Sequence, residues 1–448
     1  MKRLEVLPTP ETIADSIEND TAGRNEEIIS LIRMLDAIEG PYSLLIDAPW
    51  GDGKTFFIRS IEEVLKALNS EINGSEPLTN RLTPVMRELG ELKNTYLPFY
   101  FNAWEHDFAD EPVSALFASM AVAFKREGVE RERSWREFFG MLVEAALSFT
   151  PISADVSGAI KAISGESVID SYEKKANLRS LVDELVNECA SAHVGKLVII
   201  IDELDRCRPD FAVRLLEQTK SLFQNENVIV LISTDSLQLA HACAGLYGPG
   251  YDSQRFIERF YDRRLELGPV DPIKVVSGGS IRATSHHYDL MVEELINAHK
   301  LTIRDYARLH DKLEAGREYC EKDNYGLPVL MMARRLFIPL LIFIERDDPE
   351  LFRAVTRGAD SDALYEYGSK YPSFLKLLGR HISCAKRGQS WTGEIEVSER
   401  ECQQYVRDVC VWLYSNKRGS SELFNVCERL NIPSELDCSP FITLSFPK

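Results

Sequence analysis

The sequence predicts an α/β protein with a parallel-sheet core followed by a helical region. Short apolar runs alternate with helical patterns in the first part of the chain, which is typical of parallel strands joined by crossover helices. The clearest run, residues 196–202, is apolar without alternation from Leu197 to Ile201, as expected for a strand buried on both faces. Helical patterns dominate from about residue 285 onward. We therefore expect a core over residues 1–270, with a helical insertion around 111–190, and a helical region over 271–448.

The composition restricts the classes of partner. The chain has 448 residues, with 70 acidic against 52 basic side chains and a formal net charge of −18. An acidic surface repels phosphate backbones and anionic membrane faces, so general coating of nucleic acid is disfavoured, while a local basic groove stays compatible. The 9 cysteines form no C-x-x-C pair, which predicts reduced thiols. With no signal-like start and no apolar window of about 18 residues, the sequence indicates a cytoplasmic protein without a membrane span.

Two connecting regions are less regular. Residues 9–40 are expected to hold an N-terminal segment followed by one helix, because apolar side chains recur at helical spacing only in its second half. Residues 69–95 are rich in Asn, Ser, Gly and Pro, and we expect a polar connection there.

A phosphate-binding loop is predicted between an apolar strand over residues 42–47 and a helix over 55–68. The segment Ala48-Pro49-Trp50-Gly51-Asp52-Gly53-Lys54-Thr55 fits the pattern small-x-x-x-x-Gly-Lys-Thr, in which backbone N–H groups and a helix N-terminus surround a phosphate. Lys54 is expected to reach the β- and γ-phosphates, and the Thr55 hydroxyl to ligate Mg²⁺. Ala48 stands where Gly is preferred, which is acceptable if its φ is negative. The residues expected to bind the nucleotide are Pro49, Trp50, Gly51, Asp52, Gly53, Lys54, Thr55 and Phe56.

A metal-binding strand end is predicted where the run 196–202 stops. Carboxylates at the carboxyl tip of a buried parallel strand lie where such sheets bind ligands. We expect Asp202 to hold Mg²⁺ and Glu203 to orient and deprotonate the attacking water, with Asp205 as the rival base. An acidic strand end is often only a solvated turn. Here the phosphate-binding loop upstream favours the interpretation as a metal-binding site. The long gap between Thr55 and Asp202 predicts at least one further strand, and indicates the class in which another strand lies between the two motif strands.

Polar and basic side chains elsewhere are candidates for sensing the γ-phosphate. Asp235 ends the strand over residues 228–235 and either contacts the nucleotide or caps the next helix, and both readings remain open. The run Arg255–Tyr261 is a candidate for reaching a neighbouring site in a homo-oligomer. The candidate arginines are Arg206, Arg255, Arg259, Arg263, Arg264 and Arg304.

Taken together, these motifs resemble the KAP family of P-loop NTPases over about residues 20–310. The segments that carry the resemblance are Ala48–Thr55 with Trp50 before Gly51, Phe101-Asn102-Ala103-Trp104, Ile201-Asp202-Glu203-Leu204-Asp205-Arg206-Cys207 with Pro209 after it, Ser233-Thr234-Asp235, and Tyr251–Phe260. The resemblance implies a RecA/AAA-like core of the additional-strand class with ATP as the nucleotide. It also implies a helical lid after the core, in which Thr302-Ile303-Arg304-Asp305 resembles the arginine-bearing helix, making Arg304 a candidate sensor.

The resemblance also bears on the biological role. Many relatives carry transmembrane helices between the two main motifs, but residues 111–190 have none long enough, so a membrane role is not carried over. Bacterial members often occur in phage-exclusion or defence systems, which makes antiviral defence an expectation.

Three functions remain in competition. The first is an ATPase that serves a bacterial antiviral defence or remodelling complex together with protein partners. The second is a nucleotide-gated scaffold or switch that binds a protein partner with little hydrolysis. The third, a nucleic-acid motor, is disfavoured by the charge. The complete set of Lys54, Thr55, Asp202 and Glu203 favours the first.

Overall fold

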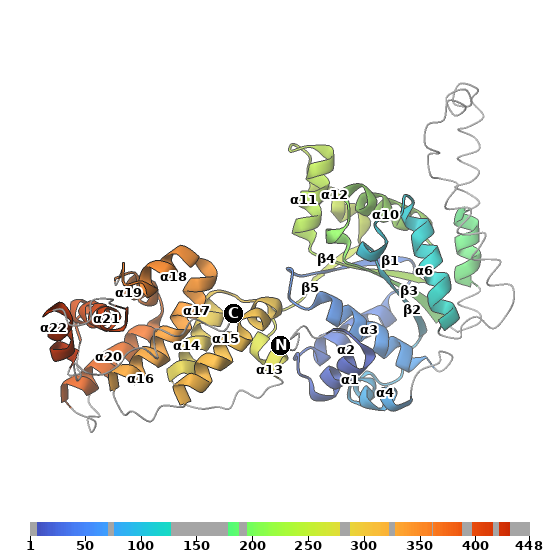
Figure 1. The fold of residues 1–448 in the computed structure, drawn as a ribbon. Coiled ribbons are helices and arrows are strands. Elements are labelled where there is room, and N and C mark those ends of the chain that lie inside the picture. Colours follow the sequence, from blue (N-terminus) through green and yellow to red (C-terminus); the bar gives the residue numbers. More distant parts are fainter. Residues whose placement is uncertain are drawn as a thin grey trace. The chain divides into compact units, whose positions relative to one another are not determined.

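The chain forms two compact units, residues 3–275 and 276–448 (Figure 1). The computed structural model describes residues 7–69, 76–126, 178–187, 195–277, 287–321, 328–360, 362–387, 397–414 and 421–430. Of the insertion predicted around residues 111–190, only α6 (Pro112–Arg126) and a helix over residues 178–187 lie within the described residues.

The first unit is built on a five-stranded sheet with the order β2-β3-β4-β1-β5. Every neighbouring pair is parallel. The strands are β1 (Tyr42–Asp47), β2 (Thr95–Asn102), β3 (Gly195–Asp202), β4 (Val228–Thr234) and β5 (Arg263–Glu266). The strand that precedes the phosphate loop, β1, is separated from β3 by β4. This order confirms the prediction of a strand between the two motif strands, whereas β5 was not predicted.

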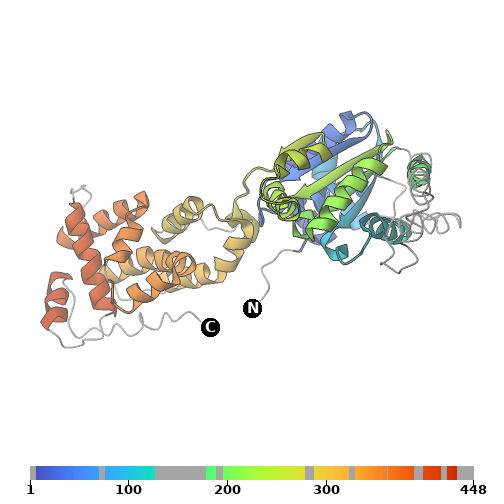
Figure 2. The ribbon, with the colours of Figure 1, turned by 90° about the horizontal axis from the view of Figure 1, so that it is seen from above.

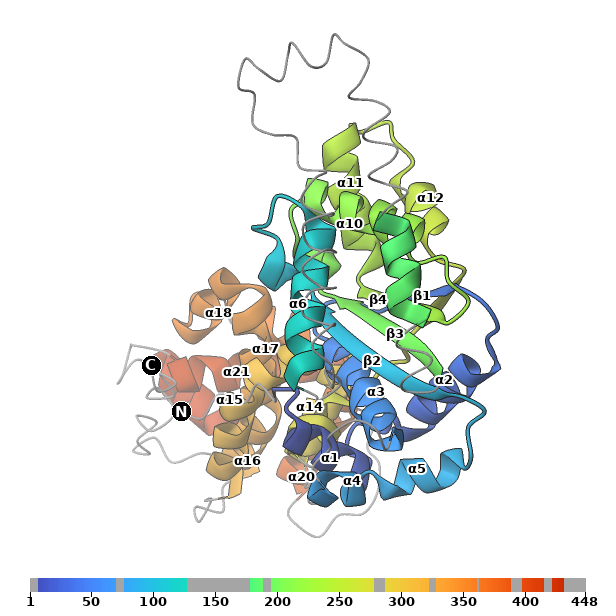
Figure 3. The same cartoon turned by 90° about the vertical axis from the view of Figure 1, so that its right-hand side faces the viewer.

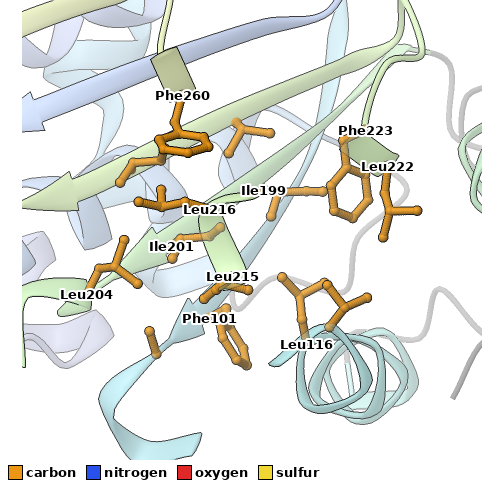
Figure 4. Packing of buried hydrophobic residues seen from close by; sticks show 14 of the residues in the cluster. Phe101, Leu116, Ile199, Ile201, Leu204, Leu215, Leu216, Leu222, Phe223 and Phe260 are labelled. Atoms are coloured by element: carbon orange, nitrogen blue, oxygen red, sulfur yellow. The ribbon is translucent and has the colours of Figure 1, made fainter. Parts of the chain in front are cut away.

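Side chains alternate between two buried faces of this sheet, as a strand's period of two residues requires. Ile200 and Leu231 face the helices α1, α2, α3 and α5, whereas Ile199 and Val230 face α6, α10 and α11. α6 lies on one side of the sheet and α3 on the other (Figure 3), and Figure 2 shows the sheet from a second direction. Figure 4 shows part of the second face around Ile199 and Ile201.

This packing fixes the register of the strands. Burying each large aliphatic side chain contributes roughly 1.5–3 kcal/mol, and a slip of one residue would exchange the two faces of a strand. Asp202 at the end of β3 would then leave the face on which α3 packs. The apolar core therefore also determines where the acidic strand end points.

The helices of the first unit agree in part with expectation. The helix after the phosphate loop is α3 (Lys54–Leu68), and α2 (Asn25–Ala37) matches the helix expected before β1. The expectation of a single helix in residues 9–40 is wrong, because α1 (Pro10–Asn19), capped by Thr9, buries Ile13 and Ile17 in the core on this side of the sheet, where it packs on α3. The remaining helices are α10 (Pro209–Leu222), α11 (Ser236–Tyr247), α12 (Ser253–Ile257) and α13 (Pro272–Ser277).

The connection expected over residues 69–95 also contains two helices, α4 (Glu76–Arg81) and α5 (Thr83–Leu89). Val85 and Leu89 of α5 are buried on the face of the sheet that α2 and α3 cover. These few apolar side chains, placed among polar residues, gave too weak a periodicity to predict a helix.

Every secondary-structure element that the structure describes in the second unit is a helix. Its elements are α14 (His287–Ala298), α15 (Ile303–Glu321), α16 (Pro328–Met332), a π-helical turn (Ala333–Phe337), α17 (Ile338–Asp347), α18 (Pro349–Thr356), α19 (Ala363–Gly368), α20 (Pro372–Arg387), α21 (Glu399–Tyr414) and α22 (Ser421–Leu430). The π turn directly precedes α17, whose second residue, Pro339, lacks the N–H of a regular helical bond. In the described part of the chain, no helix combines the length and apolarity needed to cross a membrane.

Candidate functional site

The loop between β1 and α3 has the backbone conformation that its glycines permit. Gly51 and Gly53 have φ of 95° and 80°, in the left-handed region where a Cβ is unfavourable. Gly53 is also the N-cap of α3 and offers no side chain to the first helical N–H groups. Ala48 is not among the residues with positive φ, so it meets the condition under which alanine can replace the preferred glycine.

Lys54 is folded over its own loop. The side chain is buried, and Nζ donates to the carbonyl oxygens of Ala48 at 2.5 Å and Pro49 at 3.2 Å. These two bonds hold the ammonium group inside the curve of the loop, where positive charge favours an anion.

Asp202 lies at the carboxyl end of β3 in a closed environment. Only 1% of the residue is exposed, and its carboxylate accepts hydrogen bonds from Tyr100 Oη at 3.0 Å and from the Glu203 N–H at 2.9 Å. Burial raises the pKa of Asp202, because the charged form loses its hydration, and the hydrogen bonds oppose this shift. A cation beside this carboxylate would favour its ionised form.

The two predicted motifs meet in space through Thr55 and Glu203. Thr55 Oγ1 donates to Glu203 Oε1 at 3.3 Å, although the two residues are 148 positions apart. Glu203 Oε2 is also 2.6 Å from Arg206 Nη1. Burial raises the pKa of Glu203, while the charge of Arg206 lowers it.

Glu203 has a left-handed backbone with φ of 61°. Such a conformation costs a non-glycine residue roughly 1–2 kcal/mol and persists only where its surroundings enforce it. Here the next residue, Leu204, is fully buried with Ile201 in the core (Figure 4). The anchored leucine makes the chain turn at Glu203, and the glutamate carboxylate remains beside Thr55.

The rival base, Asp205, has a different partner. Its Oδ2 accepts a hydrogen bond from Trp50 Nε1 of the phosphate loop, while Trp50 itself is 48% exposed. Asp205 and Arg206 belong to the short 3-10 helix η2 (Leu204–Arg206). The structure thus places both candidate bases at the loop, and only the carboxylate of Glu203 contacts Thr55.

The end of β4 lies between the two motif strands. Asp235 caps α11, with Oδ1 accepting from the Gln238 N–H at 3.1 Å, so the capping role that the sequence left open is present. Ser233 is opposite Asp202 in register and fully buried. Its hydroxyl lies close enough to the Asp202 carboxylate to lower the pKa of that group against the effect of burial.

Sequence reasoning missed a second network at the same edge. Asp47 ends β1, and its carboxylate accepts from the Ser236 N–H at 2.8 Å and from Ser236 Oγ at 2.6 Å. Arg264 Nη2 of β5 lies 2.7 Å from the same group. This network fastens the strand before the loop to α11 and β5, and an acidic residue ending an apolar strand was its only signal in the sequence.

Arg24 is another residue that the sequence did not single out. Its Nη2 donates to the carbonyl oxygens of Asp52 at 3.3 Å and Gly268 at 2.9 Å, and its Nη1 to Glu27 at 2.7 Å. The guanidinium is buried and therefore braces the loop from the side of α2.

The candidate sensor arginines are distributed widely. Arg206 contacts Glu203, and Arg264 pairs with Asp47 and Glu266. Arg255, Arg259 and Arg263 are exposed on α12, on the 3-10 helix η3 (Glu258–Phe260) and on β5. Arg304 lies on α15 in the second unit.

These groups fit a triphosphate and a magnesium ion. Among the described residues no three His, Cys, Asp or Glu side chains form a metal-ligand group. Thr55 and Asp202 would therefore supply only part of the coordination, and Mg²⁺ characteristically takes the rest from phosphate oxygens and water. The loop, the buried lysine and the acidic strand end supply the complementary contacts.

The fold and this loop define a P-loop nucleotide-binding α/β protein of the additional-strand class. A family model described as the KAP family P-loop domain matches residues 24–277, and the chain belongs to that family. A solved structure titled "Structure of C. elegans PCH-2" is similar over 83% of this chain and 73% of that chain, with 11% identity and a TM-score of 0.26. No curated protein matches the chain.

We predict that glycine is more stabilising than alanine at position 203. At positive φ alanine carries a steric cost of about 1 kcal/mol that glycine avoids, so Glu203→Gly should exceed Glu203→Ala in free energy of unfolding by about that amount. Urea unfolding of both variants measures the difference.

The matched control is the exposed Glu105 of the 3-10 helix η1 (Trp104–His106), which is not among the residues with positive φ. There, alanine should be at least as stable as glycine. Equal stability of the two variants at position 203 would contradict a strained backbone at that position.

Proposed function

We propose that this protein hydrolyses ATP in a Mg²⁺-dependent reaction. The observation that supports this best is the contact of Thr55 with Glu203 next to the buried Asp202, since it brings the phosphate-loop helix to the acidic strand end. A P-loop domain that only bound phosphate would not need a carboxylate beyond the metal ligand in this position.

Each residue has a role in the proposal. The N–H groups of the loop and the Lys54 ammonium bind the β- and γ-phosphates, and Thr55 and Asp202 hold the magnesium ion. The bound ion supplies charge stabilisation at the phosphates. Glu203 orients the attacking water and accepts its proton, and Asp205 mainly orders Trp50 in the loop.

The biological setting is proposed on family resemblance. We place the chain as the energy-coupling or sensing component of a bacterial antiviral defence or remodelling complex, in a homo-oligomer with protein partners from the same system. The exposed Arg259 and Arg263 are candidates to reach the site of a neighbouring copy, and Arg304 is a candidate sensor in the lid.

The alternative is a nucleotide-gated switch with little hydrolysis. One observation favours it: both oxygens of Glu203 already have partners, Thr55 and Arg206. A base engaged in this way is poorly available to water.

Replacing Lys54 by alanine should weaken ATP binding by about two orders of magnitude, because several charge-assisted hydrogen bonds to phosphate are lost. Calorimetric titration with a non-hydrolysable analogue measures the dissociation constant. Lys220→Ala, which removes a surface lysine paired with Asp262, is the control and should bind normally. Unchanged ATP affinity in a folded Lys54→Ala protein would contradict the proposal that this loop binds the phosphates of ATP.

Replacing Glu203 by glutamine should lower kcat roughly 100- to 1,000-fold, the scale of a lost general base, and leave ATP affinity nearly unchanged. Phosphate release at saturating ATP and Mg²⁺ measures this. Asp205→Asn is the matched comparison and should retain most of the turnover. The opposite ranking of the two variants would transfer the role of base to Asp205.

A further inference from the structure

Arg206 is the basic side chain in direct contact with the proposed base. Its Nη1 lies 2.6 Å from Glu203 Oε2, with the two side chains 31% and 12% exposed. The pair is therefore partly shielded from water, where an ion pair is stronger than at an open surface.

The guanidinium also lies over the ring of Trp104. The guanidinium carbon of Arg206 lies 5.4 Å from the centre of the Trp104 ring, within the range of a cation–π contact. Trp104 is half exposed and begins η1, directly after the end of β2. Arg206 thus contacts both a carboxylate of the site and an aromatic ring at the surface.

The two residues before Trp104, Asn102 and Ala103, are bonded to the end of β3 that carries Asp202. Asn102 is the register partner of Asp202, and the Ala103 N–H donates to the Asp202 carbonyl oxygen at 2.9 Å. Asn102 Oδ1 in turn accepts from the Trp104 N–H at 3.1 Å. The backbone from which the Trp104 side chain extends is therefore held next to the acidic end of β3.

This arrangement gives each carboxylate oxygen of Glu203 one partner. Oε1 accepts from Thr55, and Oε2 is paired with Arg206. A general base must take a hydrogen bond from the water that it activates. Each carboxylate oxygen can accept two hydrogen bonds, so this water would share its oxygen with Arg206 or Thr55, and the ion pair at 2.6 Å holds the carboxylate turned toward Arg206.

We propose that Arg206 is a positioning residue that restrains Glu203, and that hydrolysis proceeds when the Glu203–Arg206 pair opens. This inference rests on the proposed function and adds its regulation. It differs from the role of a γ-phosphate sensor, in which Arg206 would promote the reaction. The two roles predict opposite changes of kcat on removal of the guanidinium.

The test is ATP turnover by the full chain and by Arg206→Gln. Loss of the pair should raise kcat roughly three- to tenfold, the range expected for a partly shielded ion pair, with KM unchanged. Arg206→Lys keeps a positive charge near Glu203, and its kcat should lie between those of wild type and Arg206→Gln. The matched control is Arg208→Gln, because Arg208 binds the Asp107 carbonyl oxygen and is exposed; its kcat should equal that of the wild type.

Trp104→Ala provides a second route that leaves Arg206 in place. It removes the aromatic support of the guanidinium and should raise kcat in the same direction by a smaller factor. This variant also decides the question if Arg206→Gln does not fold, which circular dichroism would show.

The outcomes separate the two proposals. Turnover by the wild type above the level of Glu203→Gln supports hydrolysis whatever Arg206 does. With that established, an unchanged or lowered kcat in Arg206→Gln and in Trp104→Ala overturns the restraint. A wild type that binds ATP without turnover, next to an Arg206→Gln variant that hydrolyses it, supports both proposals. Absence of turnover in both overturns hydrolysis and restraint together.

Discussion

Parallel pairing of β4 with β1 on one side and β3 on the other is the constraint on which the site depends. Because parallel strands end at one edge of a sheet, this order brings Asp47, Ser233 and Asp202 to the same edge. The strands themselves are held by side chains buried on both faces, so the apolar core sets the register of the polar ends. The chemistry of the site thus follows from the packing of residues that take no part in it.

Several charged side chains lie close together at this edge of the sheet, where they are poorly hydrated. Asp202 is buried, and its raised pKa reflects the loss of hydration. Glu203 instead lies beside Arg206, and Lys54 binds carbonyl oxygens of its loop. Lys54 and Arg206 are positive groups that stand among the carboxylates of this edge and can attract the anionic triphosphate.

Sequence reasoning identified what depends on local pattern and topology. The continuous apolar runs gave β1, β3 and β4, and the spacing of Thr55 and Asp202 indicated the strand between them. It missed β5, whose residues Arg263–Glu266 are mostly charged and form a strand through pairing with β1. Short strands at a sheet edge have little apolar signal of their own.

Within the site, the sequence could name the residues but not their contacts. The Glu203–Arg206 pair depends on a left-handed turn enforced by the buried Leu204, and no propensity predicts that turn for glutamate. The network of Asp47 with Ser236 joins residues 189 positions apart. The capping role of Asp235 was one of two readings, and only coordinates could show that its carboxylate contacts the Gln238 N–H.

The most direct test of the site is electron paramagnetic resonance of Mn²⁺ bound in place of Mg²⁺ together with a non-hydrolysable ATP analogue. If Thr55 and Asp202 complete one metal site on the triphosphate, the wild-type spectrum will show coupling of Mn²⁺ to phosphorus nuclei. Thr55→Val and Asp202→Asn will then each weaken Mn²⁺ binding by about tenfold or more while the analogue stays bound. Phosphorus coupling and Mn²⁺ affinity that are the same in the wild type and in both variants would contradict the account.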